Sequence, residues 1–202
     1  MTDLSEHPVH GLSTDASQRM FFALPLNEPP AVNQEVLQRL CQLKNAYPGK
    51  GRAVPDTNLH LTLAFLGQVT AQQRDQLLTE VDQLRIPAFS VRFDQLGYWK
   101  RSKVLWLGSE ETPGELLLLA QQLSRCALTV GLPQEERAYK PHITLRRNVW
   151  HRPGLQNEQD TFHFHFQRFG LYISDPDRSG VNYRLAREWL LLTEQNAAQD
   201  ST

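Results

Sequence analysis

Residues 60–63 read His-Leu-Thr-Leu, and nearly the same four residues recur as His-Ile-Thr-Leu at residues 142–145. Side chains of a β-strand alternate between its two faces, so each copy places its His and Thr on one face and its aliphatic residues on the other. One face supplies a hydrophobic core, and the other presents an imidazole beside a hydroxyl. Two such strands side by side would surround a small anion with groups suited to acid/base chemistry without a metal.

Each copy lies within a longer repeat of similar elements. The first half is predicted to hold a strand, a helix, the His-Thr strand and an aromatic strand, at residues 20–24, 33–47, 59–66 and 89–93. The second half is predicted to repeat this order at residues 104–107, 112–131, 141–147 and 162–166. Gly67 is expected to close the first His-Thr strand. Residues 148–160 contain Pro153 and Gly154 and are predicted to form a loop, whereas the first half has an extra helix there.

The helix starts carry capping side chains. Asn33 is expected to cap the first helix, and Thr70 with Gln73 has the pattern of a capping box for the helix unique to the first half. Thr112 with Glu115 has the same pattern ahead of the helix in the second half. The final apolar run, residues 183–192, is predicted to be a strand.

These elements together predict an α+β fold of two pseudo-symmetric lobes, each an antiparallel sheet with helices on its outer face, enclosing a central cleft. Residues 1–18 are expected to form a flexible leader, residues 19–193 a single two-lobed domain, and residues 194–202 a flexible tail. Because an internally duplicated chain already has both halves of its site, we expect a monomer without an obligate protein partner.

Composition narrows the range of functions. The 202 residues are 40% hydrophobic, enough for a sizeable core, and the formal net charge of -1 provides no strong field for a long duplex. Cys41 and Cys126 fall in helical apolar patterns without metal-ligand spacing, which fits reduced thiols in a cytoplasmic protein. The leader is polar and unlike a signal peptide, and no run is long enough to cross a membrane.

The two motifs and their flanks resemble the 2H phosphoesterases, in particular the bacterial RNA 2′,3′-cyclic phosphodiesterase family, also called 2′-5′ RNA ligases. The resemblance runs from about Met20 to Leu192 and is carried by residues 58–67, 104–108 and 141–147. It implies hydrolysis of an RNA 2′,3′-cyclic phosphate to a 2′-phosphate, with reversible 2′-5′ joining of RNA ends. It also implies that His60 donates the proton to the leaving 3′ oxygen and that His142 activates water.

The residue types fit this chemistry independently. One histidine must be neutral and the other protonated, so activity is expected to peak near neutral pH. Thr62 and Thr144 can donate hydroxyl hydrogen bonds to phosphate oxygens. Two further classes remain open: an esterase for a small cyclic nucleotide, and a non-catalytic module that binds RNA ends. A pure binder would be better served by lysine or arginine, which hold an anion at every pH.

Two adjacent arginines compete for the phosphate. Arg147 occupies a position where the family often carries arginine, and Arg146 one that is usually apolar. Strict alternation would place Arg146 on the face of His142 and Arg147 on the other unless the strand bends. Neither a cofactor nor a metal is expected.

Other candidates have simpler structural explanations beside the functional one. Arg101, Trp99 and Lys103 would form a basic, aromatic lip for a nucleotide or an ordinary edge-strand surface, and Tyr139 and Tyr172 would stack on a base or simply pack. The pair His163 and His165 suggests a metal site less well than a solvated strand face. The basic C-terminal segment would hold RNA backbone or face water; its members are Arg178, Arg184 and Arg187.

Overall fold

The structure, a computed structural model, describes residues 17–26, 31–47, 50–150, 160–177 and 180–193. The expected leader, apart from residues 17 and 18, and all of the expected tail lie outside these ranges. The helices are α1 (Gln34–Ala46), α2 (Ala71–Val81) and α3 (Gly114–Thr129), with short 3-10 turns η1 (Ala31–Asn33) and η2 (Asp56–Asn58). The strands are β1 (Gln18–Pro25), β2 (Arg52–Ala53), β3 (His60–Val69), β4 (Phe89–Phe93), β5 (Gln95–Trp99), β6 (Val104–Gly108), β7 (His142–Arg147), β8 (Phe162–Phe166), β9 (Arg168–Asp177) and β10 (Gly180–Leu190).

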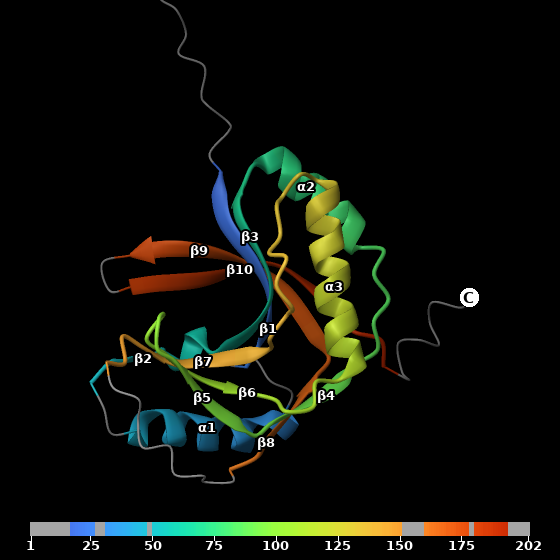
Figure 1. The fold of residues 1–202 in the computed structure, drawn as a ribbon. Coiled ribbons are helices and arrows are strands. Elements are labelled where there is room, and N and C mark those ends of the chain that lie inside the picture. Colours follow the sequence, from blue (N-terminus) through green and yellow to red (C-terminus); the bar gives the residue numbers. More distant parts are fainter. Residues whose placement is uncertain (1–16, 27–30, 48–49, 151–159, 178–179, 194–202) are drawn as a thin grey trace, which may run out of the picture.

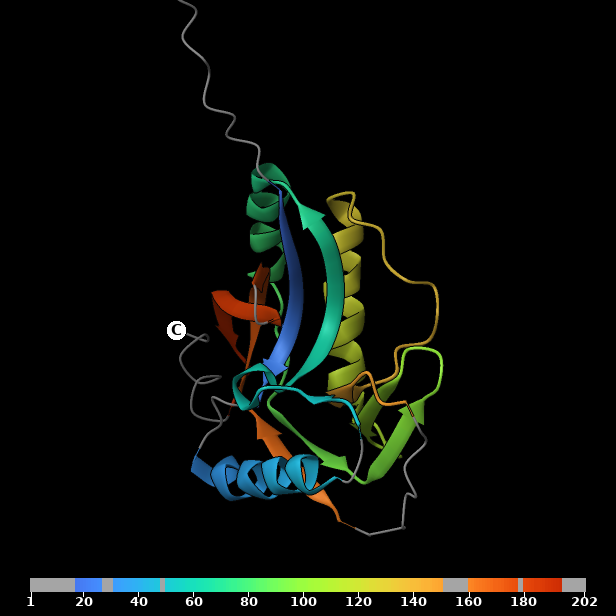
Figure 2. The same ribbon diagram turned by 90° about the vertical axis from the view of Figure 1, so that its left-hand side faces the viewer.

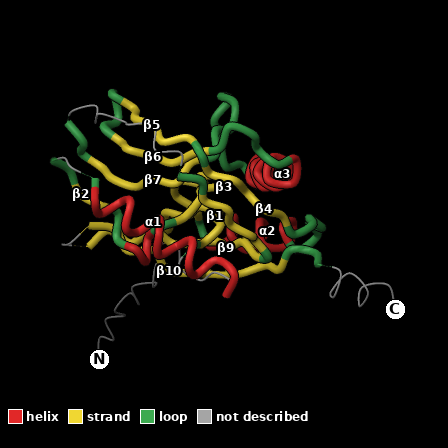
Figure 3. Tube along the Cα trace, turned by 90° about the horizontal axis from the view of Figure 1, so that it is seen from below, coloured by secondary structure: helices red, strands yellow, loops and turns green. Residues whose placement is uncertain are grey.

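Two antiparallel lobes meet at a narrow seam. The main sheet runs β10-β9-β1-β3-β7-β6-β5, with β2 paired to β7 (Figures 1 and 3). Strands β3 and β7 share a single pair, Leu61 with Ile143, so we call β10, β9, β1 and β3 the N-lobe and β7, β6, β5 and β2 the C-lobe. The predicted α+β fold with two lobes is confirmed. Figure 2 shows β1 and β3 as a long curved pair, with α3 beside β3.

The two lobes repeat each other in register as well as in order. Leu24 pairs with Leu61 in the N-lobe as Leu107 pairs with Ile143 in the C-lobe, and all four side chains are at most 1% exposed. The predicted aromatic strands β4 and β8 pair with each other, with Val91 opposite Phe164 at the centre. Each of the pairs Leu61–Ile143 and Val91–Phe164 therefore joins equivalent positions of the two halves, as expected for residues beside a pseudo-twofold axis.

Helix ends match the sequence patterns only in part. The capping box of Thr70 and Gln73 forms as predicted at the start of α2. The box predicted for Thr112 and Glu115 is wrong, because α3 begins one residue later than expected, with Pro113 as its N-cap and no side-chain cap. This shift moves the glutamate out of the third helical position, from which it would reach back to the cap.

The prediction that Asn33 caps the first helix is also wrong. Asn33 occupies the N-cap position of α1 but makes no side-chain cap bond there. Its amide instead reaches β8, where Nδ2 donates to the carbonyl of His165 at 2.6 Å and Oδ1 accepts from the same residue's N–H at 2.9 Å. Asn33 is 2% exposed, so this long-range pair replaces the predicted cap.

Strand ends also differ from expectation at one glycine. Gly67 does not close β3, which continues to Val69. Gly67 has φ +70° beside a register shift opposite Met20 and Phe21, so it supplies the backbone conformation of a bulge rather than a stop. The predicted final strand is confirmed as β10. Of the loop predicted at 148–160, residues 148–150 and 160 are described and are not helical, and the remainder lies outside the described residues.

Candidate active site

The seam between the lobes brings the two motifs together. Leu61 and Ile143 are opposite each other and 0% exposed, so their side chains face the core. By strand alternation, the flanking His and Thr of each copy face the opposite side, with His60 across from Thr144 and Thr62 across from His142. Directly opposite residues have Cβ atoms about 5 Å apart and diagonal ones about 7–8 Å, so the two histidines flank a space of roughly one phosphate group.

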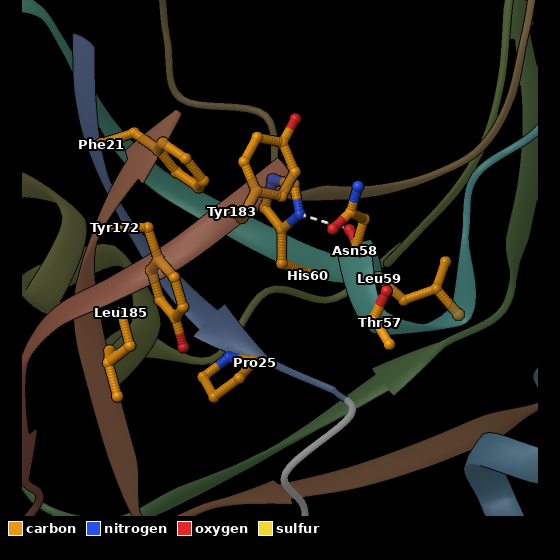
Figure 4. Close-up of a pocket in the computed structure, with 9 residues that line it drawn as sticks. All are labelled: Phe21, Pro25, Thr57, Asn58, Leu59, His60, Tyr172, Tyr183 and Leu185. Carbon is orange, nitrogen blue, oxygen red and sulfur yellow. Dashed lines mark hydrogen bonds between the residues drawn. The ribbon is translucent and has the colours of Figure 1, made fainter. Parts of the chain in front are cut away.

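The imidazole of His60 is oriented by its own strand. Its Nδ1–H donates to the carbonyl of Asn58 at 2.7 Å, which leaves Nε2 to accept from the Thr62 hydroxyl at 3.1 Å (Figure 4 shows the Asn58 bond). Phe21 and Tyr183 hold the ring from two sides, each with centroids 5.1 Å from it. His60 is therefore half-buried, with one nitrogen committed and the other presented for chemistry.

His142 has the same arrangement with different neighbours. Its Nδ1–H donates to the carbonyl of Lys140 at 2.9 Å, again two residues before the histidine. Trp99 packs against the imidazole edge to face, with ring centroids 4.5 Å apart and an interplanar angle of 74°. Both histidines thus have the same neutral tautomer, with Nε2 unprotonated.

Burial lowers the pKa of both histidines. The pKa of His60 falls to about 4, chiefly because burial disfavours the imidazolium, with the positive charges of Arg147 and His142 adding to the effect. The pKa of His142 is also lowered, first by burial and then by Arg147, Arg137 and Lys140. In each case the backbone carbonyl on Nδ1 opposes the shift. Both rings are neutral at neutral pH before an anion arrives.

A β-bulge decides the orientation of the two arginines. In β7, Thr144 pairs with Trp106 and Arg146 pairs with Leu105, so Leu145 is an extra residue between them. The bulge reverses the alternation, so the exception that the sequence left open, a bend in the strand, applies, and Arg146 does not share the face of His142. Arg146 turns toward α1, where its guanidinium donates to the carbonyls of Lys44 at 3.1 Å and Gly51 at 3.0 Å.

Arg147 takes the place that alternation had given to Arg146. It is exposed, and its positive charge lowers the pKa of both His60 and His142. Of the two candidate phosphate ligands, Arg147 is the one whose charge reaches both imidazoles. The N-lobe has the same bulge after Thr62, and there the corresponding residue is Phe65, 54% exposed.

The other candidate binding residues make contacts of their own in the structure. The hydroxyl of Tyr139 donates to the carbonyl of Thr62 at 2.8 Å, and burial raises the pKa of that hydroxyl, so Tyr139 ties the loop before β7 to the N-lobe. Tyr172 lies on the N-lobe face beside Phe21, with centroids 5.7 Å apart. Arg101 is exposed in the turn between β5 and β6, and Lys103 in the same turn lies over the ring of Trp150.

The histidine pair on β8 and the arginines of the C-terminal segment have contacts of their own. His163 and His165 face outward on β8, and Ser90 contacts the Nδ1 of His165 at 3.1 Å. Arg184 lies 3.5 Å from Asp175, and Arg187 forms an ion pair with Asp82 at 2.7 Å. Arg178 is outside the described residues. Within the described ranges, His, Cys, Asp and Glu side chains form no group of three or more that could hold a metal ion.

Sequence reasoning missed a buried lysine that supports His60. Lys44 is 2% exposed; its ammonium donates to the carbonyl of Val54 at 2.6 Å and pairs with Asp56. Asp56 opens the turn η2, whose last residue, Asn58, supplies the carbonyl that orients His60. The available signal was the spacing of Lys44, which continues the inward-facing stripe of α1 after Leu40.

Comparison with known proteins gives consistent results. A family model described as LigT like Phosphoesterase matches the chain twice, over residues 27–106 and 107–183. The RNA 2′,3′-cyclic phosphodiesterase of Escherichia coli is 34% identical over 174 residues, covering 86% of this chain and 97% of that protein. The enzyme of the same name from Thermotoga maritima is 29% identical over 181 residues, covering 84% and 94%.

A solved structure agrees with these sequence relatives. The crystal structure of E. coli LigT complexed with 3′-AMP aligns with a TM-score of 0.76 at 34% identity, covering 88% of this chain and 99% of that one. Each helix in the described part of the chain is too short or too polar to span a membrane.

Proposed function

This chain belongs to the LigT-like phosphoesterase family, and on that premise we propose that it hydrolyses a 2′,3′-cyclic phosphodiester at an RNA end to a 2′-phosphomonoester. The observation that carries the proposal is the register of the seam, where the Leu61–Ile143 pair sets two imidazoles and two hydroxyls around one phosphate-sized space. The cytoplasm, where RNA ends arise, is the proposed location.

The reaction needs a proton removed on one side of phosphorus and delivered on the other. His142 Nε2 accepts a proton from water as the new oxygen–phosphorus bond forms, and His60 Nε2–H protonates O3′ as the phosphorus–O3′ bond breaks. The 2′ ester bond stays intact, so the product carries a 2′-phosphate. The family resemblance indicates which histidine is the acid and which is the base. The shared tautomer of the two rings supports proton transfer at Nε2 in both.

Neutral side chains and one arginine then stabilise the phosphate. Thr62 and Thr144 donate hydroxyl hydrogen bonds to the non-bridging oxygens, on which negative charge develops in the transition state. The Thr62 hydroxyl, which lies 3.1 Å from His60 Nε2, becomes available for this when that nitrogen is protonated. Arg147 provides the positive charge, and Arg146 holds backbone carbonyls of the supporting loop.

Substrate binding favours protonation of His60, which then supplies the proton for the leaving oxygen. His60, with its pKa lowered to about 4, is neutral in the free protein at neutral pH. A phosphate anion beside the ring favours the imidazolium, so the anion and the proton bind together. With an RNA 5′-hydroxyl in place of water, the same groups would form a 2′-5′ linkage, the reaction that the family resemblance also implies.

Product analysis tests the proposal. Purified protein is incubated, with and without EDTA, with a short RNA ending in a 2′,3′-cyclic phosphate, and products are compared with 2′- and 3′-phosphate standards by ³¹P NMR and chromatography. We expect the 2′-phosphate at the same rate in both conditions, because two imidazoles suffice for the proton transfers. Tight binding without any phosphomonoester after hours would instead indicate an RNA-end binding module, and turnover of free cyclic nucleotides alone would indicate a small-nucleotide esterase.

A further inference from the structure

A cationic turn joins β5 to β6 at the edge of the C-lobe. Residues 100–103 read Lys-Arg-Ser-Lys, three cations in four residues of a chain whose formal net charge is -1. Trp99, the residue before this turn, packs against the imidazole of His142 with ring centroids 4.5 Å apart. The cationic turn therefore begins at the wall of the candidate active site.

The protein does not neutralise these charges. In the part of the chain that the structure describes, none of Lys100, Arg101 and Lys103 forms an ion pair with a carboxylate. Lys100 and Arg101 are exposed. A cluster of like charges without acidic partners attracts an anion, and a ligand with several phosphates can contact more than one of the cations at once.

An exposed tryptophan lies beside the cationic turn. Trp150 is 63% exposed, and the ammonium of Lys103 lies 3.2 Å from the centre of its ring. The backbone of the neighbouring Val149 fixes this arrangement, because its N–H donates to the carbonyl of Lys103 at 3.0 Å. Its carbonyl accepts from the Tyr98 hydroxyl at 2.8 Å. The indole thus has Lys103 on one face and most of its surface in solvent.

The two segments that meet at this contact each contain an unusual backbone conformation. Lys103 has φ +54° and Asn148 has φ +56°, in the left-handed region that residues other than glycine rarely adopt. Such conformations persist where surrounding contacts enforce them, and they concentrate at ligand-binding sites. Here the hydrogen bond between Val149 and Lys103 enforces them and keeps the cation beside the indole.

Trp150 is also close to the proposed phosphate ligand. It follows Arg147 by three residues, so the Cα atoms of the two residues are at most about 11 Å apart. The nucleotides that precede the cyclic end of an RNA strand are covalently attached to the terminal nucleotide. A phosphate held at Arg147 therefore keeps these nucleotides near Trp150 and the cationic turn.

We propose that the cationic turn and Trp150 bind the single-stranded RNA segment that precedes the terminal nucleotide of the substrate. The inference rests on the proposed function and extends it beyond the reaction centre. A base of this segment stacks on the Trp150 indole, and its phosphates contact Lys100 and Arg101. Aromatic rings beside a positive surface bind single strands in this way with little sequence preference. A paired base in a duplex could not unstack to reach the indole.

The first experiment compares two substrates of the wild-type protein. One is adenosine 2′,3′-cyclic phosphate, and the other is a single-stranded RNA hexamer that ends in the same nucleotide. Stacking of one base corresponds to about a tenfold gain, so kcat/KM should be at least about tenfold higher for the hexamer. A kcat/KM that is equal for the two substrates, or higher for the mononucleotide, would overturn the inference. Failure to hydrolyse either substrate would contradict the proposed function instead.

The second experiment locates the hexamer on the protein. Trp150→Ala should lower the ratio of the two kcat/KM values to about one, whereas Trp150→Phe, which keeps an aromatic face, should retain most of the wild-type ratio. The matched control is Leu128→Ala, which removes a 56% exposed apolar side chain from α3 and should keep the ratio. Melting temperatures confirm that the variants fold. An unchanged ratio in Trp150→Ala would mean that the RNA strand follows another surface, and the inference would be wrong.

The third experiment tests the cationic turn without changing the packing of Trp150. Each phosphate contact steepens the fall of log kcat/KM with log salt by about 0.7 for a single strand, so the slope should be steeper for the hexamer than for the mononucleotide. Arg101→Ala should reduce this difference in slope by about 0.7. Arg125→Ala, which removes an exposed charge from α3, is the control and should leave the difference unchanged. The same difference in slope for Arg101→Ala and the wild type would contradict the role of the turn.

Discussion

The two half-sites share a backbone design and differ in what surrounds it. Each histidine donates Nδ1–H to the carbonyl two residues earlier, and each motif is followed by a β-bulge. The bulge is followed by Phe65 in the N-lobe and by Arg147 in the C-lobe. Duplication therefore gave the same geometry twice, and the positive charge of Arg147 has no counterpart at Phe65.

The same comparison gives the two histidines different surroundings. His60 lies between Phe21 and Tyr183 and has its pKa lowered to about 4, whereas His142 is flanked by Trp99 and has its pKa lowered by burial and by Arg147, Arg137 and Lys140. A symmetric pair would share its protons evenly. The asymmetric pair can divide the work between an acid and a base, which is the difference that the following experiments probe.

The largest effect is expected from removing either imidazole. His60→Ala and His142→Ala should each lower kcat by about a hundredfold or more, because each loses a general acid or base. A cyclic substrate with sulfur in place of O3′ separates the roles, since a thiolate leaves without a proton. This substrate should restore most of the rate of His60→Ala and little of His142→Ala. Rescue of His142→Ala alone would reverse the assigned roles.

The arginines should separate substrate binding from folding. Arg147→Ala is expected to lower kcat/KM by about tenfold to a hundredfold with an unchanged melting temperature, because a charge-assisted phosphate contact is lost. Arg146→Ala should cost about 1–3 kcal/mol in the free energy of unfolding, because the carbonyls of Lys44 and Gly51 lose their donor. Steady-state kinetics and urea unfolding of both variants measure these two effects. A loss of kcat/KM in Arg146→Ala and a loss of stability in Arg147→Ala would mean that Arg146 is the phosphate ligand.

Acid should reveal the low proton affinity of His60. Unfolded His60 takes up a proton near pH 6.5, whereas the folded protein does so only near its pKa of about 4, so the free energy of unfolding should fall as the pH drops through this window. The contribution of His60 is roughly 3 kcal/mol over the whole window, of which about 2 kcal/mol is lost between pH 7.5 and 5.0. Urea unfolding at pH 7.5 and 5.0 measures it, and His60→Gln should flatten the dependence. An equally steep dependence in His60→Gln would assign the effect to other groups.

The kinetic profile carries the same information. The sequence predicts an optimum near neutral pH, but burial lowers both histidine pKa values in the free protein. Since kcat/KM reports the free enzyme, its optimum should lie below pH 6.5, whereas kcat, which reports the bound complex, should peak at higher pH. Coinciding optima would mean that the phosphate does not raise the pKa of either ring.

The smallest effect is expected at the contact between the lobes. Tyr139→Phe removes the hydroxyl that donates to the Thr62 carbonyl, which should cost about 1 kcal/mol of stability and change kcat/KM by less than about threefold. Tyr98→Phe, which removes a similar 2.8 Å bond to the Val149 carbonyl, is the matched control. Thermal unfolding and kinetics compare the two. A large loss of activity in Tyr139→Leu but not in Tyr139→Phe would instead assign a base-stacking role to the ring.

Local sequence patterns predicted most helices and strands, but not the side-chain roles that depend on long-range contacts. Alternation and helical spacing located the stripe of α3, the two motifs and the other strands except β2, β5 and β9, because burial on one face imposes those periods. The orientation of Arg146 depended on a bulge, and a bulge is a property of two paired strands. The role of Asn33 depended on a strand 132 residues away. Such long-range contacts leave no mark in the neighbouring sequence.

The Asn33 amide has a consequence for the behaviour of the protein in solution. Strand β8 pairs with β4 on one side, and on the other side the amide satisfies both backbone groups of His165 as a neighbouring strand would. An open strand edge is a template on which a second molecule can add its own strand. One asparagine side chain thus occupies that edge at His165 and opposes self-association there, a protection that a helix-capping role would not have suggested.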